Sequence, residues 1–429
     1  MSLTLPRLVA TFFVAVCGLL VTGLSVVAAG PDNTWTPTGA VLETLDSPVF
    51  ALAVDPADGR RMLAGTASGA IYLSADAGTS WKQVRKTSGR AVLTLAFDPS
   101  RPGTLLAGTR GAGVWRSVDA GLTWQSPVGG EGRTVRAFAF LNGAALAASD
   151  AGILSSRDGG QWSIAGLSQV RISALAVLPA SSSGANGTVV AGGDATQGAE
   201  PMPLFSSTDG GQTWSAVPVT GSAGVVGGST MVSALASGPA SAQGARTLFM
   251  GTNTGLFMTR DQGANWQQLT GGGALPATDV TSLAVAPRRS DRLYVASDGG
   301  GSPQGGLWVS SDAGGHFASL APPLPEVTAL VVTGEDTPTL VVATFRPTDH
   351  AVSLWTYHDA GGQPRGPVAV PPSPRTGPAA SGESTAGAGH LWWIDLIARP
   401  EAPYLAMGAG ALAVVLLAAV AYLRRGRQL

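Results

Sequence analysis

A short segment recurs along most of the chain, and its spacing restricts the possible folds more than any other feature. The segment reads Ser/Thr-x-Asp-x-Gly-x-Ser/Thr/Asn-Trp, as in "SADAGTSW" and "STDGGQTW", and we call it the tryptophan turn. Repeats of about 40–50 residues with strand-like content are typical of β-propellers, in which each repeat forms one four-stranded sheet. Successive copies lie 39 to 52 residues apart, and their aspartates are Asp76, Asp119, Asp158, Asp209, Asp261, Asp312 and, in a degenerate copy, Asp359.

Each repeat contains the patterns of four strands. It opens with an alternating apolar run such as "VFALAV" at 49–54, in which small alanines alternate with larger side chains, as is typical of an inner strand. A second run such as "RMLAGT" follows, and then a glycine-bearing loop and a third run such as "GLWVS". The tryptophan turn joins the third run to a fourth strand. These patterns predict an all-β, seven-bladed β-propeller with four-stranded blades.

The residue types of the turn indicate a structural role. Side-chain oxygens of Ser74 and Asp76 can accept hydrogen bonds from amides of their own turn, and Gly78 tolerates positive φ. We expect Trp81 to carry its large apolar area between neighbouring blades. The residues assigned to this role are Ser74, Asp76, Gly78, Trp81, Ser117, Asp119, Gly121, Trp124, Asp158, Trp162, Ser207, Asp209, Gly211, Trp214, Asp261, Gly263, Trp266, Asp312 and Gly314.

The first and last repeats complement each other. The segment "DNTWTPTG" at 32–39 has the features of the end of a turn and a fourth strand, but no earlier strands precede it. The seventh repeat has earlier strands and no tryptophan strand. We therefore predict that Trp35 belongs to the outer strand of the last blade, which closes the ring and leaves no open sheet edge.

The two ends of the chain have membrane-type sequences. Leu8–Ala29 follows Arg7 and reads as a signal peptide or an uncleaved signal anchor. Tyr404–Leu423 has no charged residue and precedes "RRGRQL", which predicts a transmembrane helix with a cytoplasmic tail. The expected domains are the signal segment at 1–30, the propeller at 31–370, a Pro/Gly/Ala-rich stalk and interfacial segment at 371–400, and the helix with its basic tail at 401–429.

The composition excludes several classes of function. Charged residues make up 12% of the 429 residues and the net charge is −1, so the chain has no strong field for nucleic acid. The single cysteine, Cys17, excludes internal disulfides and cysteine-based metal sites, and the four histidines show no ligand spacing. We predict neither a metal nor a cofactor. The expected location is the cell membrane, with one span or two, and with the propeller outside the cytoplasm.

The tryptophan turns resemble the Asp-box, or BNR, repeat. Four copies match in full, and they are Ser74/Asp76/Gly78/Ser80/Trp81, Ser117/Asp119/Gly121/Thr123/Trp124, Ser207/Asp209/Gly211/Thr213/Trp214 and Thr259/Asp261/Gly263/Asn265/Trp266. The copy at Ser156/Asp158/Gly160/Trp162 is one residue short, and the copy at Ser310/Asp312/Gly314 ends in Phe317. The repeats cover about residues 32 to 370. This resemblance implies a propeller fold but is shared by proteins of many functions.

Two enzymatic branches of that family fit this sequence poorly. Sialidases of the family carry an Arg-Ile-Pro stretch near the start and a tyrosine–glutamate pair in the central mouth. Here the nearest fragment is Arg346-Pro347 in the last repeat, and the tyrosines of the repeats, Tyr72, Tyr294 and Tyr357, lie away from the expected site. Xyloglucan-type glycosidases use two carboxylates in a cleft between two propellers, whereas this chain has one.

Another branch of the resemblance is closer in scale, namely the photosystem II assembly-factor type, a single non-catalytic propeller that docks membrane-protein subunits. The stalk and C-terminal span depart from the usual form of that type. The resemblance implies a membrane-tethered docking or assembly scaffold whose partner is a membrane or envelope protein. The alternative is a glycan-active or glycan-binding propeller.

A group of cations indicates where such a partner would dock. Loop parity in a four-stranded blade places them on the face without tryptophan turns, over the first three blades. Elsewhere the loops of that face are mostly Gly, Ala, Ser, Thr and Pro, so the group is either ordinary solubilising charge or a docking patch for acidic groups. The six cations are Arg85, Lys86, Arg90, Arg110, Arg133 and Arg136.

Overall fold

The computed structural model describes most of the repeat region and none of the terminal segments. The described residues are 32–38, 47–87, 89–126, 129–178, 187–194, 204–217, 230–240, 246–261, 263, 265–271, 275, 279–299, 305–346 and 351–361. All belong to the first of two units into which the chain divides, Met1–Pro371 and Pro372–Leu429. The predicted signal segment, stalk and C-terminal span lie outside the described residues. Among the described residues, no helix is long and apolar enough to cross a membrane.

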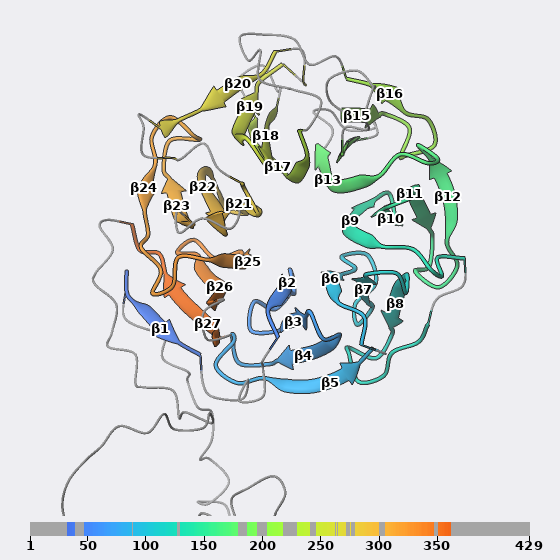
Figure 1. Ribbon diagram of the computed structural model, residues 1–429, viewed down its shortest axis with the longest axis horizontal. Helices are drawn as coiled ribbons and strands as arrows, with labels where there is room; N and C mark the ends of the chain where they lie inside the picture. The colour runs from blue at the N-terminus through green and yellow to red at the C-terminus, as the bar shows by residue number, and fades with distance from the viewer. Residues whose placement is uncertain are drawn as a thin grey trace, which may run out of the picture. The chain divides into compact units, whose positions relative to one another are not determined.

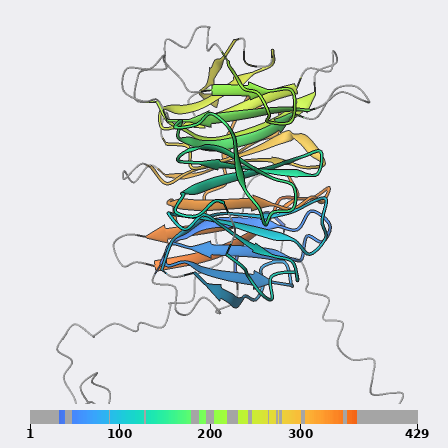
Figure 2. The ribbon, with the colours of Figure 1, turned by 90° about the vertical axis from the view of Figure 1, so that its right-hand side faces the viewer.

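The described residues form seven antiparallel sheets that surround a central axis as blades, with the first strand of each blade innermost (Figure 1, Figure 2). This confirms the predicted seven-bladed propeller. From the centre outward, the strands are β2 (Val49–Val54), β3 (Met62–Thr66), β4 (Ala70–Ser74) and β5 (Lys82–Lys86) in the first blade; β6 (Val92–Phe97), β7 (Leu105–Thr109) and β8 (Val114–Ser117) in the second; β9 (Val135–Leu141), β10 (Ala144–Ser149), β11 (Gly152–Ser156) and β12 (Ser163–Gly166) in the third; β13 (Ile172–Leu178), β14 (Thr188–Gly193), β15 (Leu204–Ser207) and β16 (Ser215–Ala216) in the fourth; β17 (Val232–Ala240), β18 (Arg246–Thr252), β19 (Gly255–Thr259) and β20 (Gln267–Leu269) in the fifth; β21 (Ser282–Ala286), β22 (Arg289–Ser297), β23 (Gly306–Ser310) and β24 (Ala318–Ser319) in the sixth; and β25 (Val327–Val332), β26 (Thr339–Arg346), β27 (Ala351–His358) and β1 (Trp35–Pro37) in the seventh.

The second blade differs from the prediction because its sheet has three strands. Its fourth position is held by one bridge, in which the backbones of Arg116 and Gln125 exchange hydrogen bonds of 3.0 and 2.8 Å. The two residues that follow the segment paired with Arg116, 127 and 128, lie outside the described part of the chain.

The N-terminal strand closes the ring as predicted. β1 pairs with β27, with Trp35 opposite Tyr357, so the seventh sheet contains both ends of the propeller sequence. The Trp35 side chain is fully buried, its indole N–H donates a 2.8 Å hydrogen bond to the carbonyl of Leu320 in the sixth blade, and its ring lies 4.8 Å from that of Tyr357. The closing strand therefore joins two blades.

The hydrophobic core lies between blades, and the alternation of the inner strands explains how it is divided. Ala51 and Ala53 of β2 face the second blade, whereas Leu52 and Val54 face the seventh. Small residues on one side and larger residues on the other let adjacent inner strands approach near the axis.

The turn tryptophans belong to the same clusters. Trp81 packs with Val341 and Leu354 of the seventh blade, and Trp124 packs with Leu63 and Ile71 of the first. Each aromatic residue thus anchors its own blade to the preceding one.

Candidate functional site

The tryptophan turns are held by a repeated set of hydrogen bonds. In the first blade the Ser74 hydroxyl donates to Asp76 Oδ1 (2.9 Å) and accepts from the Gly78 amide (2.9 Å). Asp76 also accepts from the Ser80 amide (2.8 Å) and hydroxyl (2.6 Å), and the Trp81 indole N–H donates to the Gly78 carbonyl (3.0 Å). Gly78 has φ of +83°, as its position requires. In this blade the contacts of Ser74, Asp76 and Gly78 thus lie within the turn itself.

In the short turn of the third blade, the structure changes the assignment of the turn glycine. Gly160 was expected to match the turn glycine, but the Gly159 amide donates to Ser156 Oγ (2.8 Å), and the Gly159 carbonyl accepts from the Trp162 indole (3.0 Å). Gly159 also has the positive φ, +78°. This turn has one residue fewer between its serine and its glycine than the other turns have. The glycine that bonds to the serine hydroxyl and the tryptophan indole is therefore Gly159, one position earlier than expected.

From the six described turns, Asp76 to Asp312, we predict that the stability of the fold depends on pH. Hydrogen bonds from the Thr123 side chain and amide lower the pKa of Asp119 to about 2, and those from Thr259 and Asn265 lower the pKa of Asp261 to about 2. An unfolded aspartate titrates near pH 3.9. Because the folded pKa is the lower one, the turns stabilise the fold above about pH 4, and that contribution is lost as the pH falls toward 2.

We therefore expect the midpoint of thermal unfolding to fall between about pH 4 and pH 2. Circular dichroism melts across this range measure it. The Asp119→Asn variant should melt lower at pH 7 and lose less on acidification than the wild type. A midpoint that stays constant down to pH 2 would contradict the coupling between the turns and stability.

Asp359 of the degenerate seventh turn has a different environment. Its carboxylate accepts hydrogen bonds from the Arg292 guanidinium and from the Tyr294 hydroxyl (2.6 Å), both on β22 of the sixth blade. Asp359 and Arg292 are 1% and 5% exposed, and burial together with this carboxylate raises the pKa of Tyr294. Only the bond from the Gly361 amide (3.1 Å) remains local. Asp359 is thus an inter-blade ion-pair residue, which corrects its assignment as a weak turn aspartate.

Backbone hydrogen bonds define the two faces of the ring. The Ala77 amide in a tryptophan turn donates to Arg60 in the loop between β2 and β3 (2.9 Å), so these loops share one face, which we call the turn face. On the opposite face, the Thr87 amide donates to Gly69 (2.7 Å), which links an inter-blade segment to the loop between β3 and β4. The faces follow the expected loop parity.

Three of the predicted cations lie in loops of the opposite face. The Arg110 amide donates to Ala91 beside Arg90 (2.9 Å), and the Gly113 amide donates to the Arg133 carbonyl (2.9 Å). A β-carbon placed on Gly111 would lie 3.7 Å from Arg90 Nη1, so the Arg90 side chain extends over the neighbouring loop of Arg110. Lys86, at the end of β5, is exposed.

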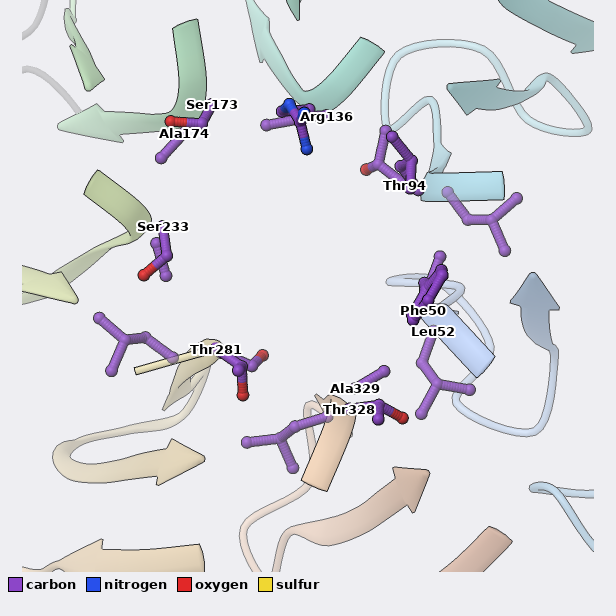
Figure 3. A pocket seen from close by; sticks show the side chains of 18 of the residues that line it. Phe50, Leu52, Thr94, Arg136, Ser173, Ala174, Ser233, Thr281, Thr328 and Ala329 are labelled. Carbon is purple, nitrogen blue, oxygen red and sulfur yellow. The ribbon is translucent and has the colours of Figure 1, made fainter. Parts of the chain in front are cut away.

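The other two cations are placed differently from the expected loop surface. Arg85 belongs to β5, is half-buried, and stacks its guanidinium 4.5 Å from the centre of the Trp115 ring in the second blade. Arg136 belongs to β9 and is exposed, but it lines the mouth of the central channel (Figure 3). The predicted docking patch is therefore reduced to four cations, which are Lys86, Arg90, Arg110 and Arg133.

The channel mouth is a cavity of about 280 Å³ lined by residues near the starts of all seven inner strands. In the first strand the pairing shifts between Val49 and Ala51, so Phe50 is an unpaired bulge residue, and the same shift occurs in five other blades. Bulges redirect side chains. The residues at this position, taken from the first blade to the seventh, are Phe50, Leu93, Arg136, Ser173, Ser233, Thr281 and Thr328.

Hydroxyl groups at four of these positions connect adjacent blades. Ser173 donates to the Val232 carbonyl (2.5 Å), Thr281 to Val327 (3.1 Å) and Thr328 to Val49 (2.7 Å). Ser233 donates likewise to the Val280 carbonyl. The hydroxyl oxygens, having used their hydrogens, can only accept from a ligand. The mouth therefore has an acceptor side over blades four to seven and a side with Phe50, Leu93 and Arg136.

Three acidic residues lie in the chain segments next to strands of the sixth and seventh blades, at the same face. Asp279 and Glu326 lie two residues before Thr281 and Thr328, and Asp298 follows β22. Burial and the negative charge of Asp298 raise the pKa of Asp279. The same two causes raise the pKa of Glu326, although Arg346 partly offsets them. Sequence analysis missed this cluster because its members belong to three different loops.

Two further observations restrict the chemistry of this face. Among the described residues, no group of three His, Cys, Asp or Glu side chains is placed to hold a metal ion. The large exposed hydrophobic residues in the described part of the chain are Val118, Leu122, Ile164 and Met231, none of which is aromatic.

Comparison with known proteins gives structural matches alone. No family model matches the sequence, and a search of curated proteins finds no match. The GH74 xyloglucanase from Xanthomonas campestris superposes with a TM-score of 0.54 at 18% identity, and the match covers 76% of this chain and 56% of the xyloglucanase. YCF48 from Cyanidioschyzon merolae has a TM-score of 0.52 at 12% identity and is covered over 98% of its length, with 76% of this chain. YCF48 bound to D1 peptide has a TM-score of 0.53 at 15% identity, with 77% of this chain and 96% of that one covered.

These neighbours include both a glycoside hydrolase and a propeller that binds a peptide. At such low identities they show that the chain has the fold of a seven-bladed propeller and do not distinguish between the two functions.

Proposed function

We propose that this chain is a non-catalytic propeller of the Asp-box type that docks a membrane or envelope protein through its opposite face. The observation that carries the proposal is the crowding of Lys86, Arg90, Arg110 and Arg133 onto adjacent blades of a chain in which only 12% of residues are charged. Such a surface attracts acidic groups of a partner. In this proposal the propeller lies outside the cytoplasm and is tethered by Tyr404–Leu423.

Two further observations support a docking role. The tryptophan turns have purely structural contacts, so the repeated motif leaves the opposite face free for binding. A solved complex of YCF48 with a peptide shows that a propeller similar in fold, and of similar length to the region matched here, can bind a protein segment.

Charge reversal on the patch tests the proposal. We expect the Arg110→Glu/Arg133→Glu variant to capture the partner about tenfold more weakly or worse from detergent-solubilised membranes, because like charges would then face each other. The wild-type capture should weaken with salt, since exposed charges are screened over about 10 Å at 0.1 M. Quantitative mass spectrometry of tagged protein measures both effects.

The matched control reverses two exposed arginines of the turn face, Arg60 and Arg157. This variant should capture the partner as the wild type does. Equal capture by both double variants would reduce the patch to solubilising charge. Melting curves of each variant establish that the fold is retained, which is expected because Arg110 and Arg133 lie in loops.

The second candidate is a glycan-active propeller, and the raised pKa values of Asp279 and Glu326 favour it, because the general acid of a glycosidase has a raised pKa. Two features count against it: the mouth is a small cavity rather than a groove, and the described face has no exposed aromatic platform for sugar rings. Release of reducing sugar from xyloglucan by the wild type, and its loss in Asp279→Asn, would favour this candidate over docking.

A further inference from the structure

The channel mouth is separate from the docking patch and has its own chemistry. Arg136 is the cation among its lining residues, and its guanidinium has no hydrogen-bond or ion-pair partner among the described residues. Figure 3 shows its side chain directed toward the open centre, away from the backbone of β9. A guanidinium that is held by its strand and lacks a partner is a donor for a carboxylate, which it can bind through two parallel hydrogen bonds.

The side of the mouth across from Arg136 has the complementary character. Thr281 and Thr328 lie there, in the sixth and seventh blades (Figure 3). Their hydroxyl hydrogens are used on the carbonyls of Val327 and Val49, so their oxygens can only accept hydrogen bonds. Asp279 and Glu326, two residues earlier on the same chain segments, add negative charge. An ammonium group would therefore be bound on this side.

The wall between the two sides and the size of the mouth limit the ligand further. Phe50, Leu52 and Leu93, from the first and second blades, are apolar residues of the lining. The cavity of about 280 Å³ is just below the 300–1,000 Å³ that is typical of ligand pockets, so it suits a small molecule rather than a polymer.

We infer that the channel mouth binds a small zwitterion of the amino-acid or short-peptide class, with its carboxylate on Arg136 and its ammonium group on the side of Thr281, Thr328, Asp279 and Glu326. Small apolar side chains of the ligand would contact Phe50 and Leu93. The inference does not depend on the docking proposal, because it uses none of the patch residues and needs no partner protein.

Trialanine and its blocked forms test this inference by isothermal titration calorimetry on the full chain in detergent. We expect wild-type protein to bind trialanine, and trialanine amide to bind about tenfold more weakly or not at all, because it lacks the carboxylate. N-acetyl-trialanine should bind about two- to fivefold more weakly, since it loses an exposed charge interaction. In the Asp279→Asn/Glu326→Gln variant, trialanine and N-acetyl-trialanine should bind with equal affinity.

Arg136→Gln should weaken trialanine binding about tenfold or more. The matched control is Arg171→Gln on the same face, where the guanidinium is already paired with Asp194 at 3.1 Å, and it should bind like the wild type. Absence of trialanine binding, or equal affinity of Arg136→Gln and wild type, would overturn the inference. If the wild type bound N-acetyl-trialanine as tightly as trialanine, the ammonium site would be overturned. The C-terminus of a protein would then fit the mouth as well as a zwitterion does. The comparison of blocked ligands uses wild-type protein and does not depend on the folding of any variant.

Discussion

Replacing Trp35 with alanine should destabilise the propeller by about 3–5 kcal/mol, which is the usual cost of removing a fully buried tryptophan. The effect is large because this side chain packs against both the sixth and the seventh blades and its indole N–H satisfies the Leu320 carbonyl. Loss of β1 would also leave the outer edge of β27 unpaired. Urea unfolding followed by tryptophan fluorescence or circular dichroism measures the loss.

Leu122→Ala is a suitable control, because this side chain is 71% exposed and its removal should change stability by no more than about 0.5 kcal/mol. If Trp35→Ala lost less than about 1 kcal/mol, ring closure by β1 would not contribute to the stability of the fold. Limited proteolysis at the seventh blade gives an independent measure, since an open ring should be cut there first.

Replacing Asp359 with alanine should cost about 3–5 kcal/mol, because it leaves the Arg292 guanidinium buried without its counter-charge. The Tyr294 hydroxyl would lose its acceptor at the same time. Chemical unfolding at neutral pH measures the difference from wild type.

Two comparisons distinguish this buried pair from an ordinary ion pair. Asp58→Ala removes the exposed partner of Arg60 and should cost no more than about 1 kcal/mol. The combined variant Arg292→Met/Tyr294→Phe/Asp359→Leu leaves no unpaired polar group and should recover most of the lost stability. A loss for Asp359→Ala no larger than that of Asp58→Ala would show that the network is energetically unimportant.

The sequence does not show which copies of the tryptophan turn keep an aspartate that bonds within its own turn. Asp359 and Asp312 look alike as degenerate turns, yet Asp312 accepts the hydrogen bonds of its own turn while Asp359 reaches Arg292 in another blade. The difference arises because the seventh turn is split between the two ends of the propeller sequence. Its tryptophan comes from β1, and the indole of Trp35 bonds to Leu320 rather than to the turn glycine.

The sequence by itself determined the number of blades, the turn chemistry and the closing strand, because each depends on residues that are close together in the chain or repeated at a fixed spacing. Alternation and the Asp-x-Gly pattern act within one hairpin, so local physics is enough to identify them.

Only the tertiary structure decided which side chains face one another across the axis. Arg136 looked like one of six loop cations, but a bulge at the start of β9 directs it into the channel, while Arg85 is covered by Trp115. Thr281 and Thr328, which lie across from Arg136, are far away from it in the sequence and no motif links them to it. Ring closure sets their placement relative to Arg136, because it brings the third blade opposite the sixth and seventh (Figure 1).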